Sequence, residues 1–416
     1  MPRIFVHFSL IFFILTALSG VIMRVFPFYP FDGIPYTNIL HGHSHLAILG
    51  WAFLGVFTVF LSVGWPSIRQ KKQAAAIVCT LFITSLIMFA AFLYEGYALY
   101  SIIMSTAHIF VEYWAAVFMY RQLKNLGSKS GQLFMKGALA ALIISSIGPF
   151  ALGYISASGL KESQLFDMAI YFYLHFQYNG WLYLALLGLF AIVMDMKQIP
   201  IRVSFLKLGF WIYFISLFPG YFLNVLWADL GETAHFLSII GSIGQWIGTI
   251  CIIFAFKKVW KSLRIEYSKF TVSFLWITFF LLFLKSSMEL GLISPKLAEL
   301  VYETRSVIIG YLHFTLLGFV SFFILVQYQM QRIIELKNGF MLFFAGFFIN
   351  EILLFSQGLL EWMNMDGVPF LTHGLLLASV LLLLGILMIW LSYFRWEQNR
   401  QHKGNHSLSN FLNNHV

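Results

Sequence analysis

The chain has 416 residues, of which 60% are hydrophobic and only 10% are charged, and its mean hydropathy is +0.82. A soluble domain this apolar would lack the polar side chains to cover its surface, so the composition excludes a soluble fold and predicts a polytopic membrane protein. The net charge of +9 could indicate nucleic-acid binding, but the placement of the basic residues described below argues against that class.

Twelve apolar segments are long enough to cross the hydrocarbon core of a bilayer, and they predict an all-α protein with twelve transmembrane helices. They lie at 4–24, 39–64, 73–95, 100–121, 135–157, 168–194, 203–227, 235–256, 270–291, 305–329, 339–361 and 368–394. We expect the first segment to be retained, although it resembles a signal peptide, because the repeat described below needs it. Residues 1–396 should form one membrane domain, and the polar residues 397–416 a disordered cytoplasmic tail.

The basic residues predict the orientation in the membrane. Most of the 26 Lys and Arg residues lie on one side of the predicted bilayer, and many acidic residues lie on the other. Because Lys and Arg are enriched in cytoplasmic loops, both termini should be cytoplasmic. The positive charge therefore reflects topology, and no nucleic-acid partner is expected. We expect a multi-pass protein of the cell membrane, and of a bacterial inner membrane in particular.

A histidine-rich tract, His41-Gly42-His43-Ser44-His45, opens the second predicted helix. Imidazole is poorly solvated by hydrocarbon, so histidines at the mouth of a membrane helix favour a metal, a haem or a proton path as partner. The last histidine begins a motif that consists of a histidine, a glycine five residues later and then an aromatic residue. The motif occurs at His45, Gly50 and Trp51, at His175, Gly180 and Trp181, and at His313, Gly318 and Phe319.

The motif histidines lie on predicted helices 2, 6 and 10, and His108, His235 and His373 lie on helices 4, 8 and 12. This pattern predicts three copies of a four-helix unit, at about 1–130, 131–265 and 266–396. All even helices enter from outside, so the six histidines should share one layer in the outer leaflet. A single histidine in a membrane helix is about as often a hydrogen-bonding residue between helices as a ligand. Six histidines at one depth favour a metal or a haem.

A haem needs an axial imidazole and closely packed apolar and aromatic surfaces. The glycine of the motif removes a side chain from the helix surface, and the following Trp or Phe could form a wall of the haem pocket. The alternative is ordinary packing of small residues between membrane helices.

The segment from His43 to Trp51 and the overall topology resemble subunit I of the haem–copper oxidase superfamily, in its branch of cbb3-type oxidases and nitric oxide reductases. The resemblance implies three four-helix arcs in pseudo-threefold arrangement and an oxidoreductase that takes electrons from a cytochrome c-type or quinol donor. It implies that His45 and His313 bind one low-spin haem. It also implies that His175 binds a non-haem metal, either copper or iron.

The chain departs from the family on two helices. The family carries a His–His pair on helix 7 and two histidines on helix 10, whereas helix 7 here has none and helix 10 has only His313. A divergent haem protein without a complete binuclear centre is therefore expected. The remaining candidate metal ligands have no counterpart in the family motif, and they are His108, His235, His373 and Glu112.

Four other polar residues could take part in haem binding or in proton transfer. Arg24 and Arg305, at outer helix ends, could clamp the haem propionates or simply anchor loops. Glu351 and Lys285 lie within helices and are candidates for a proton path, although Lys285 could instead form a structural pair with Glu289. Two other functions remain open: a transporter, and a nitric oxide- or haem-responsive sensor of the NnrS type.

Overall fold

The computed structural model describes residues 1–30, 33–335, 337–365 and 369–413, with side chains described up to residue 394. In these ranges every regular element is a helix. Twelve helical segments are long and apolar enough to cross a bilayer, which confirms the predicted all-α membrane fold. In chain order, spans 1 to 12 are Ile4–Val25, Tyr36–Gly64, Lys71–Glu95, Leu99–Leu123, Lys129–Ala157, Gln164–Met196, Val203–Ala228, Glu232–Ala255, Lys269–Gly291, Arg305–Met330, Asn338–Trp362 and Pro369–Phe394.

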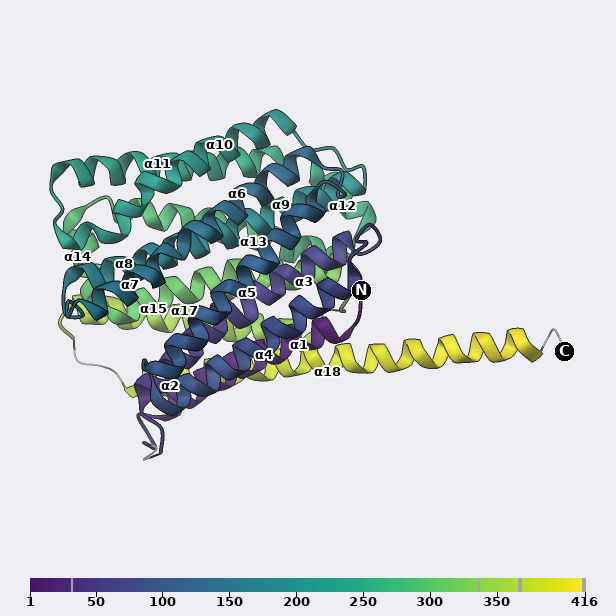
Figure 1. Ribbon diagram of the computed structural model, residues 1–416, viewed down its shortest axis with the longest axis horizontal. Helices are drawn as coiled ribbons and strands as arrows, with labels where there is room; N and C mark the ends of the chain where they lie inside the picture. The colour runs from purple at the N-terminus through teal and green to yellow at the C-terminus, as the bar shows by residue number, and fades with distance from the viewer. Residues whose placement is uncertain (31–32, 336, 366–368, 414–416) are drawn as a thin grey trace.

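Most spans are single α-helices that run side by side along the bundle (Figure 1). These helices are α1 (Ile4–Val25), α4 (Lys71–Glu95), α5 (Leu99–Leu123), α11 (Glu232–Ala255), α13 (Lys269–Gly291), α17 (Asn338–Trp362) and α18 (Pro369–Asn413). Span 5 joins α6 (Lys129–Ser145) to α7 (Ile147–Ala157), and span 7 joins α10 (Val203–Gly220) to the 3-10 helix η3 (Tyr221–Ala228). Two short helices, α12 (Val259–Glu266) and α14 (Pro295–Glu303), precede and follow span 9.

Spans 2, 6 and 10 each contain a π-helix between two α-helices. They consist of α2 (Tyr36–His45), η1 (Leu46–Ala52) and α3 (Phe53–Gly64), of α8 (Gln164–Leu174), η2 (His175–Leu182) and α9 (Tyr183–Met196), and of α15 (Arg305–His313), η4 (Phe314–Ser321) and α16 (Phe322–Met330). Each π-helix begins at the motif histidine or directly after it, and contains the glycine and the aromatic residue of the motif. Because π-helical turns are rare and are frequent at functional sites, they mark these three segments for attention.

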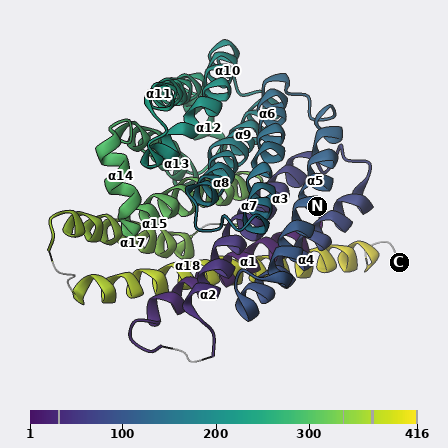
Figure 2. The same cartoon turned by 60° about the vertical axis from the view of Figure 1, so that its left-hand side comes forward.

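The same three spans form the centre of the bundle. Within their most apolar stretches, 89%, 89% and 61% of the residues are buried, against 33–56% in the other spans. Direct hydrogen bonds join them: Trp51 Nε1 donates to Ser321 Oγ (2.8 Å), and Gln327 Nε2 donates to the Leu186 carbonyl (3.2 Å). Figure 2 shows α3 and α9 among the surrounding helices. Most residues in these stretches of spans 2, 6 and 10 are therefore shielded from lipid.

The motif glycines lie where two helices approach closely. A Cβ atom built on each glycine would lie close to a side chain of a neighbouring helix. At Gly50 it would lie 3.3 Å from Phe12, at Gly180 2.5 Å from Ala141, and at Gly318 2.7 Å from Phe347. The motif aromatics also pack in the core, where Trp51 stacks on Phe13 with ring centroids 4.0 Å apart. Helix packing, which was the alternative to a porphyrin surface, thus accounts for the Gly–aromatic part of the motif.

The N-terminus and the cytoplasmic end predicted for span 12 lie at the same end of the bundle (Figure 1). Span 5 begins at Lys129, several residues earlier than expected, because the Ser128 hydroxyl accepts a hydrogen bond from the Gly131 amide and caps the helix. Helix α18 continues through the tail expected to be disordered as far as Asn413, in a stretch that contains no proline. Residues 414–416 of that tail lie outside the described residues.

Candidate functional site

Two histidines from the central spans 2 and 10 face each other. The ring centroids of His43 and His313 are 6.4 Å apart, and the ring planes meet at 83°. Nδ1 of His43 donates to the Thr16 carbonyl on α1 (2.9 Å), and Nδ1 of His313 lies 3.4 Å from the amide nitrogen of Asn350 on α17. Neither Nε2 atom has a hydrogen-bond partner among the described residues. Because Nδ1 of His43 donates, its Nε2 keeps a lone pair for a ligand. A ligand at Nε2 of His313 requires that Nδ1 carry the proton and face the side-chain oxygen of Asn350 instead of its nitrogen.

Helix α1 brings a cationic side chain to this pair. A Cβ built at Gly20 would lie 3.6 Å from Cε1 of His43, so the imidazole of His43 packs against α1. Arg24 lies four residues further on the same helix face and acts electrostatically on both imidazoles. Arg305 is exposed at the start of α15, and no described contact links it to the pair. Of the two predicted propionate clamps, Arg24 is the one near the histidines.

His45, which was expected to pair with His313, points elsewhere. Residues two positions apart on a helix lie on nearly opposite faces, so His43 and His45 cannot both face span 10. The ring of His45 packs against Phe92 (4.2 Å between centroids) and lies 5.9 Å from the ring of Tyr97. Its Nδ1 donates to the His41 carbonyl (3.0 Å). The sequence motif marked His45, and His43 takes the expected place beside span 10.

His175 was predicted to bind a non-haem metal, but both of its ring nitrogens are used by hydrogen bonds. Nε2 donates to the Leu217 carbonyl (2.8 Å), and Nδ1 accepts from the side-chain amides of Asn224 (2.8 Å) and Asn179 (3.3 Å). The side chain is fully enclosed, with the residue 1% exposed. An imidazole held in this way has no free lone pair for a metal.

A buried ion pair lies next to His175 and joins spans 6, 9 and 10. Lys285 Nζ donates to Glu289 Oε1 (2.9 Å) and to Oδ1, the side-chain oxygen, of Asn179. Glu289 Oε1 also accepts from the Tyr311 hydroxyl (2.5 Å), and the rings of Tyr178 and Tyr311 lie 5.6 and 5.9 Å from the ammonium. Each charge is therefore compensated by several partners, which favours the structural interpretation of Lys285 over a proton path.

His108 and Glu112 form a second buried group between α4 and α5. His108 is fully buried, and its Nδ1 lies 2.7 Å from the Thr84 hydroxyl. Its Nε2 is 3.9 Å from Oε1 of Glu112, and this carboxylate oxygen is buried without a hydrogen-bond partner. The predicted proximity of the two side chains is thus present.

The other two histidines of the predicted layer are bound to backbone carbonyls. His235 Nε2 donates to Ile293 (2.9 Å), and the exposed His373 donates through Nδ1 to Pro369 (2.9 Å). In the part of the chain that the structure describes, no three His, Cys, Asp or Glu side chains converge in a way that could hold a metal ion. His108 lies beside Glu112, but His235 and His373 do not join them, so the described ligands do not form a copper or non-haem iron centre.

Glu351 is the remaining predicted proton-path residue, and it lies near the facing histidines. It is 6% exposed, and its Oε1 accepts from the amide of the neighbouring Asn350 (3.1 Å). Its Oε2 is buried without a hydrogen-bond partner.

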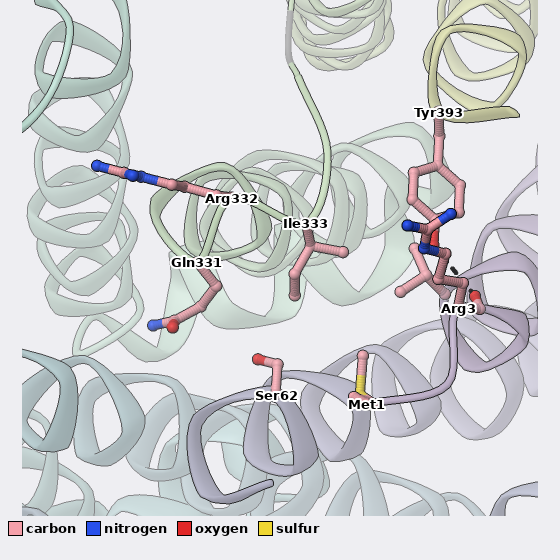
Figure 3. Close-up of a pocket in the computed structure, with 8 residues that line it drawn as sticks. Met1, Arg3, Ser62, Gln331, Arg332, Ile333 and Tyr393 are labelled. Carbon is pink, nitrogen blue, oxygen red and sulfur yellow. Dashed lines mark hydrogen bonds between the residues drawn. The ribbon is translucent and has the colours of Figure 1, made fainter. Parts of the chain in front are cut away.

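An open pocket lies at the opposite end of the bundle, beside the N-terminus. It has a volume of about 210 Å³ and is lined by Met1, Arg3, Val6, Ser62, Gln331, Arg332, Ile333 and Tyr393. Figure 3 shows that Arg332 extends away from the other labelled side chains. No histidine or carboxylate lines this pocket, so it is separate from the predicted site.

Comparison with protein-family models and with curated proteins finds no match for this chain.

Proposed function

We propose that this chain is a haem-binding redox protein of the cell membrane, in which His43 and His313 are the axial ligands of one haem. The observation that carries the proposal is the 6.4 Å separation of the two ring centroids. An imidazole nitrogen binds a first-row metal at about 2 Å and lies ~1.1 Å from its ring centre. Twice the sum of these two lengths is ~6.2 Å, so His43 and His313 are spaced such that they would hold one iron atom between them.

The surroundings of the pair suit a haem. The Thr16 carbonyl fixes the Nδ1 proton of His43, so the Nε2 lone pair is available for iron. Arg24 would pair with a propionate, because a guanidinium offers two parallel donors to a carboxylate. When bound, the haem would supply a one-electron redox centre, and the protein residues would orient it and exclude water.

Electron transfer fits these residues better than reduction of oxygen or nitric oxide. Both ring nitrogens of His175 are engaged, span 7 carries no histidine, and no group of three metal ligands converges within the described part of the chain. The protein would accept electrons from a cytochrome c-type or quinol donor in a bacterial inner membrane. A sensor that responds to nitric oxide or haem would use the same pair of histidines.

The test is the absorption spectrum of the detergent-purified protein. We expect a Soret band that is lost in the His43→Ala and His313→Ala variants. His45→Ala is the matched control, because it removes an imidazole two residues away that faces α4, and it should keep the band. A colourless wild-type protein, or an unchanged spectrum in both ligand variants, would show that the proposal is wrong.

A further inference from the structure

The short helix α12, which connects spans 8 and 9, carries four exposed basic residues on one side. It lies at the same end of the bundle as the N-terminus, the end predicted to face the cytoplasm (Figure 1). Val259 and Leu263, one turn apart, are fully buried and fix the orientation of the helix. At about 100° per residue, the side opposite to this pair presents positions 258, 261 and 264. We call the exposed cations of this side and of the preceding turn the basic face, which consists of Lys257, Lys258, Lys261 and Arg264.

No carboxylate neutralises the basic face. The acidic residue of α12, Glu266, pairs with Lys197 at 2.5 Å. In the described part of the chain, no other carboxylate forms an ion pair with any of the four cations. Exposed charges of one sign create a local potential that attracts a partner of the opposite sign. The basic face is therefore suited to an anionic partner.

Two tryptophans place α12 at the level of the lipid headgroups. The ring of Trp260 stacks on that of Trp276 in α13, with centroids 3.8 Å apart. Trp276 is 44% exposed on the surface of span 9, seven residues after the span begins. Seven helical residues correspond to about 10 Å along the axis. Because tryptophan is enriched where headgroups meet hydrocarbon, α12 lies against the lipid-facing surface of span 9 at this boundary.

One apolar side chain projects among the cations. Ile265 is 89% exposed and lies one turn after Lys261. An aliphatic side chain gains free energy when it leaves water, so this position favours contact with hydrocarbon. A soluble anion would satisfy the four charges but would leave Ile265 in water. Positive charge together with an exposed apolar side chain is typical of helices that bind anionic membrane surfaces.

We propose that the basic face of α12 binds the phosphate groups of anionic phospholipids, while Ile265 inserts beside the upper part of their acyl chains. Arg264 is the residue that can hold one phosphate through two parallel hydrogen bonds. A Lys or Arg near an anionic membrane surface strengthens binding by about fivefold. The inference names a lipid partner, goes beyond the proposed redox function and does not depend on the presence of haem.

The experiment is a lipid titration of the purified full-length protein in an uncharged detergent, followed by native mass spectrometry. We expect phosphatidylglycerol to bind more tightly than phosphatidylcholine with the same acyl chains. The triple variant Lys258→Gln/Lys261→Gln/Arg264→Gln should weaken phosphatidylglycerol binding by about 100-fold, which is three factors of about five. Binding of phosphatidylcholine should not change. The charge-conserving variant Lys258→Arg/Lys261→Arg should keep the wild-type affinity.

The matched control removes three exposed cations from another loop at the same end of the bundle. This control is Arg69→Gln/Lys71→Gln/Lys72→Gln, and it should keep the tight binding of phosphatidylglycerol. An equal loss in the control would show that general surface charge, and not α12, attracts the lipid, and would overturn the inference. Equal affinity for the two lipids, or an unchanged affinity in the α12 triple variant, would also overturn it.

A competition experiment separates a lipid site from a site for free phosphate compounds. Soluble glycerol phosphate carries the phosphate group without acyl chains, and we expect it not to displace phosphatidylglycerol at equal concentration. Ile265→Ser should weaken phosphatidylglycerol binding although it changes no charge. Efficient displacement by glycerol phosphate, or full affinity in Ile265→Ser, would show that the basic face does not recognise a lipid.

Discussion

Removal of the ammonium group of Lys285 would leave the carboxylate of Glu289 buried without its countercharge. The two side chains are only 2% and 11% exposed, and their charged atoms are 2.9 Å apart. Breaking a buried pair by removing one partner costs about 3–5 kcal/mol. The hydrogen bonds from Tyr311 and Asn179 to Glu289 would remain, so we expect Lys285→Met to cost about 3 kcal/mol. That corresponds to a decrease in the folding equilibrium constant on the order of 10².

This effect can be measured by unfolding the protein in mixed micelles with an increasing fraction of a denaturing detergent. Tryptophan fluorescence reports the unfolding. The double variant Lys285→Met/Glu289→Gln removes both charges and should cost less than the sum of the two single variants. Lys337→Met is the matched control, because Lys337 and Glu335 also pair at 2.9 Å but are 67% and 51% exposed. It should cost less than about 1 kcal/mol. If Lys285→Met costs no more than this control, or if the costs of the two single variants simply add, the buried ion pair does not stabilise the fold.

Two further predictions concern helix packing and a surface ion pair. Gly180→Ala places a Cβ 2.5 Å from Ala141 and should destabilise the fold by about 1–3 kcal/mol in the same unfolding assay, whereas Gly153→Ala, which meets open space, should not. Outside the spans, partial burial alone would lower the pKa of Lys197, but its hydrogen bond to Glu266 raises the pKa above its usual value and lowers that of Glu266. The stabilisation should therefore be lost as pH falls through the lowered pKa of Glu266 and as pH rises through the raised pKa of Lys197. Glu266→Gln should remove both dependences in unfolding measured across pH, and their persistence would contradict this assignment.

The spans could be predicted from the sequence because hydrocarbon imposes a simple length and composition on every crossing helix. The ends were less certain, since they depend on single capping residues such as Ser128. The motif located the three spans with π-helices, but the hydrogen bonds that define a π-helix are not visible in a pattern of side chains. The sequence therefore predicted where the three motif segments lie, but it did not predict that their backbone is π-helical.

The choice among the histidines of span 2 depended on a helix face that the motif did not specify. His45 occupies the repeated position, but His43 lies seven residues, or about two turns, before Gly50, and both His43 and Gly50 face α1. That spacing was a usable signal. The state of His175 could not be read in the same way, because its partners Leu217 and Asn224 come 42 and 49 residues later in the chain.

The separation in sequence between the partners of the central polar network has a consequence for biosynthesis. Asn179 is translated 106 residues before Lys285, and His175 is translated 49 residues before Asn224. At about 5–20 residues per second, Asn179 on span 6 is synthesised ~5–20 s before Lys285, its hydrogen-bond partner on span 9. Because unpaired amides are costly in hydrocarbon, we expect span 6 to stay at the insertion machinery, or in contact with earlier spans, until span 9 arrives. We therefore expect its release into the bilayer to follow synthesis of most of the chain.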